Sequence, residues 1–262
     1  MRSIFNTLTT LTAVTVIQAY PHHANCNSTS SAISPAATSK ANAQLFRDLV
    51  SSPAAIQRSR RLLVEDGVLR TGDDLRQIAV FDFNDPQPTG GAMGGASKAA
   101  TVETYPFSIG LDISATVVFL EPCGINTPHV HPRAAEFLTP IEGSNLRFGS
   151  ILEDGLVKPG ENQEITGTLS RLQATAFVQG SMHWQFNDAC EKAVYVAVLG
   201  SGDAGANRVT NFLSLDADVV SATLGLPSNI NSTSIKQFAQ AIPANPVQDV
   251  NKCLARCRPA AA

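Results

Sequence analysis

The chain has 262 residues, 44% of them hydrophobic and 16% charged, and its formal net charge is −3 at pH 7. This length can hold one large domain or two small ones. The weak negative charge excludes the basic surface that nucleic-acid binding requires. Beyond the first residues no apolar run is long enough to cross a bilayer, so we expect neither a nucleic-acid nor a membrane partner.

Residues 1–19 have the pattern of a secretory signal peptide. Arg2 is their only charged residue, an apolar, threonine-rich run follows, and the small residue Ala19 marks the expected cleavage site. A buried N-terminal helix fits poorly, because Thr and β-branched residues dominate the run. We therefore expect a secreted, extracellular protein, for example of the cell wall or apoplast.

Residues 20–73 are expected to form a leader and an N-terminal helical extension. Tyr20–Ser39 is rich in Ser, Ala and Asn without apolar periodicity, which predicts disorder. A helical face begins at Leu45, and Ser52-Pro53 is the expected N-cap and first position of a second helix that stops at Gly67. We interpret these helices as packing or oligomer elements.

Two N-x-[ST] triplets, at Asn27 and Asn231, remain in the exported part of the chain. Both lie in polar, loop-like sequence where a glycan is tolerated. Such triplets also arise by chance, so either use or disuse as a glycosylation site in a eukaryotic host is compatible with the sequence.

Residues 74–212 are expected to form a β-domain, because the hydrophobic period shortens toward two. The first strand is expected around Ile78–Phe83, before a Gly-rich connection that lacks the lysine of a phosphate-binding loop. Later strands are expected at Phe107–Ile113, Ala115–Leu120, around His129, Leu146–Leu152, Ala174–Val178 and Ala193–Leu199. Gly and Pro separate them as in a sandwich or barrel, so the fold class is all-β.

Residues 213–262 are expected to form a C-terminal helical arm and tail. One helix is expected within Asn211–Gly225, with Ser214 or Asp216 as its N-cap. A second is expected around Ile235–Ile242, where apolar residues recur at helical spacing. Both amphipathic faces need another surface to bury against.

Four side chains have the spacing of a metal site. His129 and His131 are two residues apart, so in a strand their rings lie on one face. A proline on either side of the pair favours extended backbone and excludes a helical HExxH site. Glu136 follows closely, and His183 is the next histidine along the chain. We infer that these four residues bind one metal ion.

Three imidazoles and a carboxylate, without thiolate, suit Mn, Fe, Ni, Cu or Zn better than Ca or Mg. An octahedral ion with four protein ligands keeps two positions open for chemistry. The alternative is that the His-x-His pair is an ordinary core or surface feature. That alternative is weaker here because the only other histidines, His22 and His23, lie in the expected leader.

The sequence at these residues resembles the cupin superfamily, and within it the germin-like and spherulin-like secreted proteins. The first cupin motif, Gly-x5-His-x-His-x3,4-Glu-x6-Gly, matches at His129, His131, Glu136 and Gly143. Cys123 stands where the motif has its first glycine.

The second cupin motif, Gly-x5-Pro-x-Gly-x2-His-x3-Asn, matches in part. Gly180, His183 and Asn187 agree with it, whereas Leu172 replaces its first glycine and Val178 its proline. The resemblance covers about residues 74–244. It implies a single jelly-roll β-barrel with helical extensions and a manganese-type site, for which Fe²⁺, Ni²⁺ and Cu²⁺ are alternatives.

Five cysteines leave at least one thiol without an intramolecular partner. The resemblance implies a Cys123–Cys190 disulfide between the ends of the two metal-binding segments. For Cys253 and Cys257 the sequence leaves two alternatives, a small C-terminal loop or a pairing with Cys26.

The resemblance points to Mn-dependent oxalate oxidase or superoxide dismutase activity, with a small-molecule substrate or superoxide. The family holds oxalate with two asparagine amides; Asn126 matches one of these, but Thr116 occupies the other position. A hydroxyl lacks the reach of an amide, so the threonine weakens the recognition of oxalate. Dismutase activity needs less substrate recognition and tolerates the threonine better. The resemblance also implies a homo-oligomer, a dimer or a hexamer.

A second class of function is a non-enzymatic extracellular, cell-wall or storage protein of the spherulin type, with a structural or vestigial metal site. Oxygenation of a larger substrate is a further alternative, in which Phe177, Trp184 and Phe186 would line a pocket. For those aromatic residues a place in the barrel core is the simpler interpretation.

Overall fold

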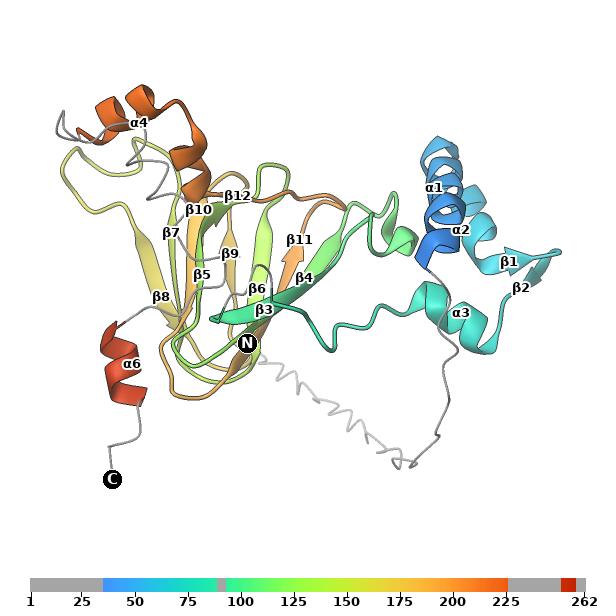
Figure 1. Cartoon of the computed structure of the whole chain (residues 1–262), viewed down its shortest axis with the longest axis horizontal. Coiled ribbons are helices and arrows are strands. Elements are labelled where there is room, and N and C mark those ends of the chain that lie inside the picture. The colour runs from blue at the N-terminus through green and yellow to red at the C-terminus, as the bar shows by residue number, and fades with distance from the viewer. Residues whose placement is uncertain (1–34, 89–92, 226–250, 258–262) are drawn as a thin grey trace, which may run out of the picture. The chain divides into compact units, whose positions relative to one another are not determined.

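The structure is a computed structural model that describes residues 35–88, 93–225 and 251–257 (Figure 1). The expected signal peptide, Cys26, Asn27, Asn231 and the helix expected at 235–242 lie outside these residues. Residues 1–41 and 42–262 form separate compact units, and the description below concerns the second unit apart from the start of the first helix. Within the described residues, no helix is both long and apolar enough to cross a membrane.

The N-terminal part contains three helices. They are α1 (Pro35–Ser51), α2 (Ala55–Leu63) and α3 (Gly72–Ala79). Because α1 begins at Pro35, the end of the leader that was expected to be disordered is helical. The N-cap of α2 is Ala54 rather than Ser52, and it makes no side-chain capping bond.

A short hairpin follows α2, formed by β1 (Val64–Glu65) and β2 (Val68–Leu69). Its turn is Asp66-Gly67, and both residues have positive φ, 49° and 82°. An Asp-Gly turn of this kind matches the twist of a tight hairpin. Gly67 therefore turns a hairpin instead of ending a helix, which corrects the sequence-based expectation.

The strand expected at Ile78–Phe83 is absent, because residues 72–79 form α3 and residues 80–83 have no regular structure. Asp73 and Asp74 in the first turn of α3 favour this helix through its dipole. The segment expected as a strand at Phe107–Ile113 is instead a 3₁₀ helix, η2 (Pro106–Ser108), followed by turns.

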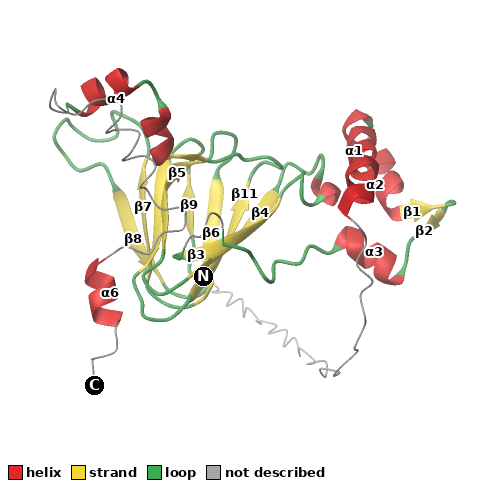
Figure 2. Cartoon of the chain, in the orientation of Figure 1, coloured by secondary structure: helices red, strands yellow, loops and turns green. Residues whose placement is uncertain are grey.

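In the described part of the chain, ten strands form two five-stranded antiparallel sheets (Figure 2). The first sheet has the order β12 (Asn207–Arg208), β5 (Ile125–Val130), β10 (Met182–Asn187), β7 (Leu146–Ile151), β8 (Ile165–Leu169). The second has the order β3 (Gly95–Ala100), β4 (Ser114–Leu120), β11 (Ala193–Leu199), β6 (Glu136–Glu142), β9 (Thr175–Phe177). The expected all-β fold with helical extensions is confirmed.

Within the two sheets, the sequence did not predict strands β3, β6, β8 and β12, and all of these except β6 lie at the edges of their sheets. β3 reads GASKAA and has no β-branched or aromatic residue, so its propensity for a strand is low. Its pairing with β4 over six residues determines its conformation.

The main hydrophobic core draws on both sheets. Its largest members, Tyr195 from β11 and Phe177 from β9, are each 1% exposed. Leu146 and Leu169, from β7 and β8, close the core from the other sheet. The metal-site residues described below belong to the same two sheets.

After β12 the chain forms a 3₁₀ helix, η3 (Val209–Ser214), and the helix α4 (Ala217–Leu224). The side chain of Asp216 accepts hydrogen bonds from the backbone N–H groups of Asp218 and Val219, and Gly225 ends the helix with a φ of 61°. Asp216 is therefore the N-cap, one of the two residues expected. The last described element is α6 (Asn251–Cys257).

The disulfides differ from the expected Cys123–Cys190 pair. Cys123 is bonded to Cys253, and Cys190 to Cys257. The expectation was correct in one respect: the N–H of Cys123 donates to the carbonyl of Ala189, so the two barrel cysteines are neighbours. Each is bonded instead to α6, where cysteines four residues apart lie on one face of the helix. The two alternatives considered for Cys253 and Cys257 are both wrong.

Candidate metal centre

Strand register brings the predicted ligands together from both sheets. His183 on β10 is the direct antiparallel partner of His129 on β5, and His131 follows one residue after β5. Glu136 begins β6 in the other sheet. The site therefore lies between the two sheets, with histidines on one side and the carboxylate on the other.

The four side chains converge on one point. Each offers a ligand atom, and all four atoms lie within 4.8 Å of one another. Oε2 of Glu136 is 3.0 Å from Nε2 of His131 and 3.4 Å from Nε2 of His183. His129, Glu136 and His183 are buried, whereas His131 is partly exposed at the cavity.

Each imidazole is oriented by a backbone carbonyl that its Nδ1 contacts. The carbonyls belong to Thr127 for His129, Ser181 for His183 and Gly205 for His131, at 2.8, 2.9 and 2.5 Å. A carbonyl only accepts, so Nδ1 carries a hydrogen, and in a neutral ring the lone pair is then on Nε2, where a metal can bind. This is the usual arrangement around histidines that bind metals.

For His129 and Glu136 the electrostatics of the metal-free site favour the protonation states that a metal requires, whereas for His131 they favour the proton that a metal would displace. Burial, with the nearby His183, lowers the pKa of His129 to about 4. Burial alone would raise the pKa of Glu136, but its close contacts with His131 and His183 hold it at about 2. For His131, the bonds to Glu136 and Gly205 outweigh burial and raise the pKa. A neutral His129 and an ionised Glu136 are therefore present at neutral pH.

The residues fit a bound transition metal. Nε2 of His183 is buried and makes no hydrogen bond of good geometry, since Oε2 of Glu136 is 3.4 Å away, an arrangement that is costly unless something else satisfies the atom. The donor set has three neutral imidazoles and one carboxylate, which suits several divalent first-row metals. The ring of Phe177 stacks on the imidazole of His183 with ring centroids 4.3 Å apart, which limits rotation of the imidazole.

Two positions that depart from the motif glycines keep a glycine-like backbone. Cys123 has a φ of 61° and Leu172 a φ of 65°, both in the left-handed region. Gly143 and Gly180, which the motifs retain, have φ values of 81° and 78°. The turns around the site are therefore preserved despite the substitutions, at an energetic cost to the two L-residues.

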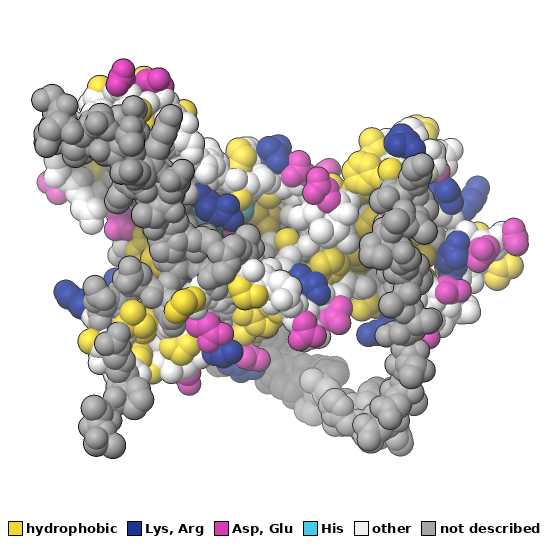
Figure 3. Space-filling view, viewed as in Figure 1, with side chains coloured by type: hydrophobic (Ala, Val, Ile, Leu, Met, Phe, Trp, Pro, Cys, Tyr) yellow, Lys and Arg dark blue, Asp and Glu magenta, His cyan; other side chains and the backbone are white. Residues whose placement is uncertain are grey.

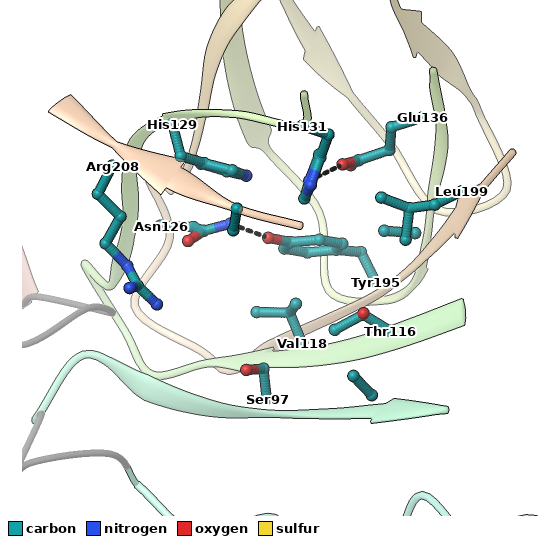
Figure 4. A pocket seen from close by; sticks show the side chains of 13 residues that line it. Ser97, Thr116, Val118, Asn126, His129, His131, Glu136, Tyr195, Leu199 and Arg208 are labelled. Carbon is teal, nitrogen blue, oxygen red and sulfur yellow. Dashed lines mark hydrogen bonds and ion pairs between the residues drawn. The ribbon is translucent and has the colours of Figure 1, made fainter. Parts of the chain in front are cut away.

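A cavity of about 190 Å³ adjoins the ligands (Figure 4). His129, His131 and Glu136 line it, and so do Asn126 and Thr116, the two positions that the resemblance compares with substrate-binding amides. The cavity has room for roughly six water molecules at about 30 Å³ each. It is smaller than the pockets that hold drug-sized ligands, so only a small ligand fits.

The aromatic residues considered for a larger pocket are elsewhere. Phe177 packs in the core, and Nε1 of Trp184 donates to Glu164. Phe186 packs against the disulfide region with Cys123 and Cys253. None of the three lines the cavity, so the simpler expectation of core residues is supported.

The sequence did not predict a polar network on the cavity wall. Nδ2 of Asn126 donates to Oε1 of Gln185 at 2.8 Å and to the hydroxyl of Tyr195 at 3.0 Å. That hydroxyl also contacts Oε1 of Gln185 at 3.0 Å. Burial, together with the charge of Glu136, raises the pKa of Tyr195 well above its ordinary value, so the phenol stays protonated.

The sequence also gave no indication of Arg208, which lines the same cavity. Tyr195 sits in an apolar strand where it is read as core, and Arg208 follows a loop. Neither has a local motif, and both were identifiable only once the strand pairing was known.

Comparisons with known proteins agree with this geometry. The Cupin family matches residues 81–232. Spherulin-1A of Physarum polycephalum is 31% identical over 84% of this chain and 81% of its own length. Spherulin-1B of the same organism is 31% identical over 84% of this chain and 80% of its own length. Germin-like protein 12-2 of Oryza sativa subsp. japonica is 40% identical over 38% of this chain and 43% of its own length.

Among solved structures, an oxalate oxidase in complex with the substrate analogue glycolate has a TM-score of 0.52 at 24% identity, covering 60% of this chain and 79% of that chain. At this identity the likeness concerns the fold. The family match extends over more than half of the chain, and the spherulin relatives cover most of it. The chain belongs to the cupin family, in which its His129, His131, Glu136 and His183 form a candidate metal site.

Proposed function

We propose that this protein is a secreted, manganese-dependent oxidoreductase. The observation that supports the proposal is the convergence of three Nδ1-anchored histidines and Glu136 beside a small cavity. His129, His131, Glu136 and His183 would hold manganese, which would supply a redox centre beside the cavity. The protein's own part is to orient the ligands and to exclude all but small molecules.

The size of the cavity narrows the substrate to superoxide or a small carboxylate such as oxalate. The likeness in fold to oxalate oxidase is compatible with the second choice. Thr116 lines the cavity where the resemblance calls for an amide, and its hydroxyl offers a shorter donor. Superoxide requires fewer hydrogen-bond donors from the cavity wall than oxalate does, so dismutase activity depends less on Thr116.

A specific observation favours a second candidate, a non-enzymatic extracellular, cell-wall or storage protein of the spherulin type. Both N–H groups of the Asn126 side chain are engaged by Gln185 and Tyr195. With Thr116 at the other position, the cavity has fewer amide donors for oxalate than the resemblance calls for. In this candidate function the metal would stabilise the fold.

Secretion and self-association are part of the proposal. Two disulfides are consistent with an oxidising compartment, as are the relationships to germins and spherulins. Phe137 on β6 and Val178 after β9 are 54% and 59% exposed, and β6 pairs with β9. Exposed apolar side chains on adjoining strands support a homo-oligomer, a dimer or a hexamer.

The test uses protein secreted from a eukaryotic host and compares the wild type with Thr116→Asn. Manganese electron paramagnetic resonance is recorded before and after adding oxalate, and superoxide loss and oxalate-dependent oxygen uptake are assayed separately. A spectrum that responds to oxalate, with uptake that rises in Thr116→Asn, supports an oxidase. Superoxide loss without an oxalate response supports a dismutase. Bound metal with neither activity contradicts the enzyme proposal and supports the structural role.

A further inference from the structure

Arg208 reaches the metal-site cavity from the edge of the first sheet. It belongs to β12, whose pairing with β5 places Arg208 directly opposite the metal ligand His129. Its side chain runs beside Asn126 at the margin of the cavity (Figure 4). The register of two strands therefore fixes a guanidinium next to the site.

Arg208 forms no ion pair with an acidic residue of the described part of the chain, whereas Arg133 and Arg147 each pair with an aspartate. Among the described residues that line the cavity, Arg208 is the only Lys or Arg, and the only acid, Glu136, is engaged with histidines. Figure 3 shows basic side chains scattered over the surface, so position at the cavity distinguishes this one.

The amide and phenol donors on the cavity wall are used within the protein, whereas the hydroxyls of Ser97 and Thr116, which also line it, carry no charge. Both N–H groups of Asn126 point to Gln185 and Tyr195, and the Tyr195 hydroxyl has Oε1 of Gln185 within 3.0 Å. A guanidinium has five N–H donors in a planar fork that matches a carboxylate. Arg208 thus offers the donors and the charge that Asn126 does not.

We propose that Arg208 is the specificity-determining residue of the cavity and that it selects a small carboxylate ligand. The guanidinium binds the carboxylate while the rest of the ligand lies in the cavity beside His129 and His131. This inference rests on the proposed function, because it names the substrate class of the same site. An anionic ligand is also attracted to a positive charge at the cavity margin before it binds.

The test measures ligand binding rather than turnover. Glycolate is the probe, and glycolamide, its uncharged counterpart, is the matched ligand control. Dissociation constants are determined by calorimetry for the wild type, Arg208→Gln and Arg208→Lys, each loaded with manganese and each metal-free. Arg171→Gln is the control variant, since Arg171 is an exposed arginine on the barrel that donates to the Ile141 carbonyl and does not line the cavity.

Arg208→Gln is expected to weaken glycolate binding about tenfold, a modest factor because the exposed guanidinium is screened by water and salt. Arg208→Lys should retain part of the affinity, because it keeps the charge and loses the fork. Glycolamide binding, manganese content and the thermal midpoint should not change. Arg171→Gln should bind glycolate as the wild type does.

Two results overturn the assignment: equal glycolate affinity in the wild type and Arg208→Gln, or no measurable glycolate binding to the wild type in either metal state. The proposed function fails separately, when the wild type takes up no manganese or has neither activity. If the wild type fails in this way but its glycolate binding still depends on Arg208, the carboxylate site is supported and only the proposed oxidoreductase activity is rejected.

Discussion

His129 and His183 lie directly opposite each other in the antiparallel pair of β5 and β10, with ring centroids 4.4 Å apart. The distance between these two metal ligands is therefore set by backbone pairing rather than by a flexible loop. The register changes immediately after His183, so Gln185 pairs with Asn126 on the cavity wall. One strand pair thus positions half of the metal site and part of the adjoining network.

The first prediction concerns the disulfides. Peptide mapping of non-reduced protein should recover Cys123 linked to Cys253 and Cys190 linked to Cys257. The double variant Cys253→Ser/Cys257→Ser should lose roughly 2–4 kcal/mol of unfolding free energy per cross-link, because each disulfide closes a long loop. A peptide linking Cys123 to Cys190 in the native protein would contradict the structure.

Helix α6 should depend on these disulfides for its docking. It has seven residues, too few for a stable helix in isolation, and Arg256 is its ion-pair contact to Asp188 on the barrel. In the double variant we expect faster proteolysis of the last described segment than in Arg256→Gln, which keeps both cross-links. Equal proteolysis rates in the two variants would show that the disulfides are not what holds α6.

The second prediction concerns Leu172, which is 67% exposed and has a φ of 65°. Leu172→Gly should raise the unfolding free energy by about 0.5–1 kcal/mol, because glycine removes the left-handed strain, although it increases the entropy of the unfolded chain. Leu156→Gly is the matched control: Leu156 is 51% exposed and has no positive φ. The control should lose stability, and a loss in Leu172→Gly as well would refute the strain argument.

The third prediction concerns the hydroxyl of Tyr195. Tyr195→Phe removes one hydrogen-bond partner each from Asn126 and Gln185, so we expect a loss of about 1–3 kcal/mol in urea unfolding. Asn126 also loses an anchor, and glycolate binding should change in this variant. Tyr105→Phe is the control, since its hydroxyl donates to the Ala79 carbonyl away from the cavity. Equal effects of both variants on glycolate binding would exclude a role of Tyr195 in positioning Asn126.

The fourth prediction concerns acid stability of the metal-free protein. The pKa of His129 is about 4 in the folded state, against 6.5 in an unfolded chain, chiefly because of burial. The unfolded state therefore binds more protons between these values. His129 makes the unfolding free energy fall as pH falls through this window, by on the order of 3 kcal/mol at its lower end.

The pKa shifts of the other two groups affect the unfolding free energy in a different pH range or with the opposite sign. The stability that Glu136 contributes is present above pH 4.5 and is lost only as pH falls toward about 2. The raised pKa of His131 contributes stability below pH 6.5 that is lost as pH rises. Urea midpoints of chelator-treated wild type and His129→Asn, at about pH 7 and about pH 4.5, isolate the effect of His129. An equal decrease in both proteins would contradict the assignment.

The sequence predicted that the four candidate metal ligands converge because their signals are local. His129 and His131 share a face through the two-residue period of a strand, and all histidines outside the leader fall in two short segments. The expected strand at Ala193–Leu199 matches the structure, whereas Ile78–Phe83 and Phe107–Ile113 also contain β-branched and aromatic residues but form helix, turn or irregular structure. Edge strand β3 lacks these residues, and its conformation follows from pairing with β4.

Other features depend on contacts between distant segments. The disulfide partner of Cys123 lies 130 residues away on a seven-residue helix, and no apolar periodicity in the sequence predicts that helix. Tyr195 and Asn126 meet only because β11 and β5 face each other across the cavity. Arg208 is placed by the register of a two-residue strand. Spacing along the chain contains none of this information.

The central claim is that His129, His131, Glu136 and His183 form one metal site. Elemental analysis of the secreted protein, wild type beside His183→Ala, tests it most directly, with circular dichroism to verify that the variant is folded. We predict about one manganese per wild-type chain and nearly none in the variant, because the buried Nε2 of His183 is then missing. A wild type without transition metal, or a folded variant with the same metal content, would contradict the account.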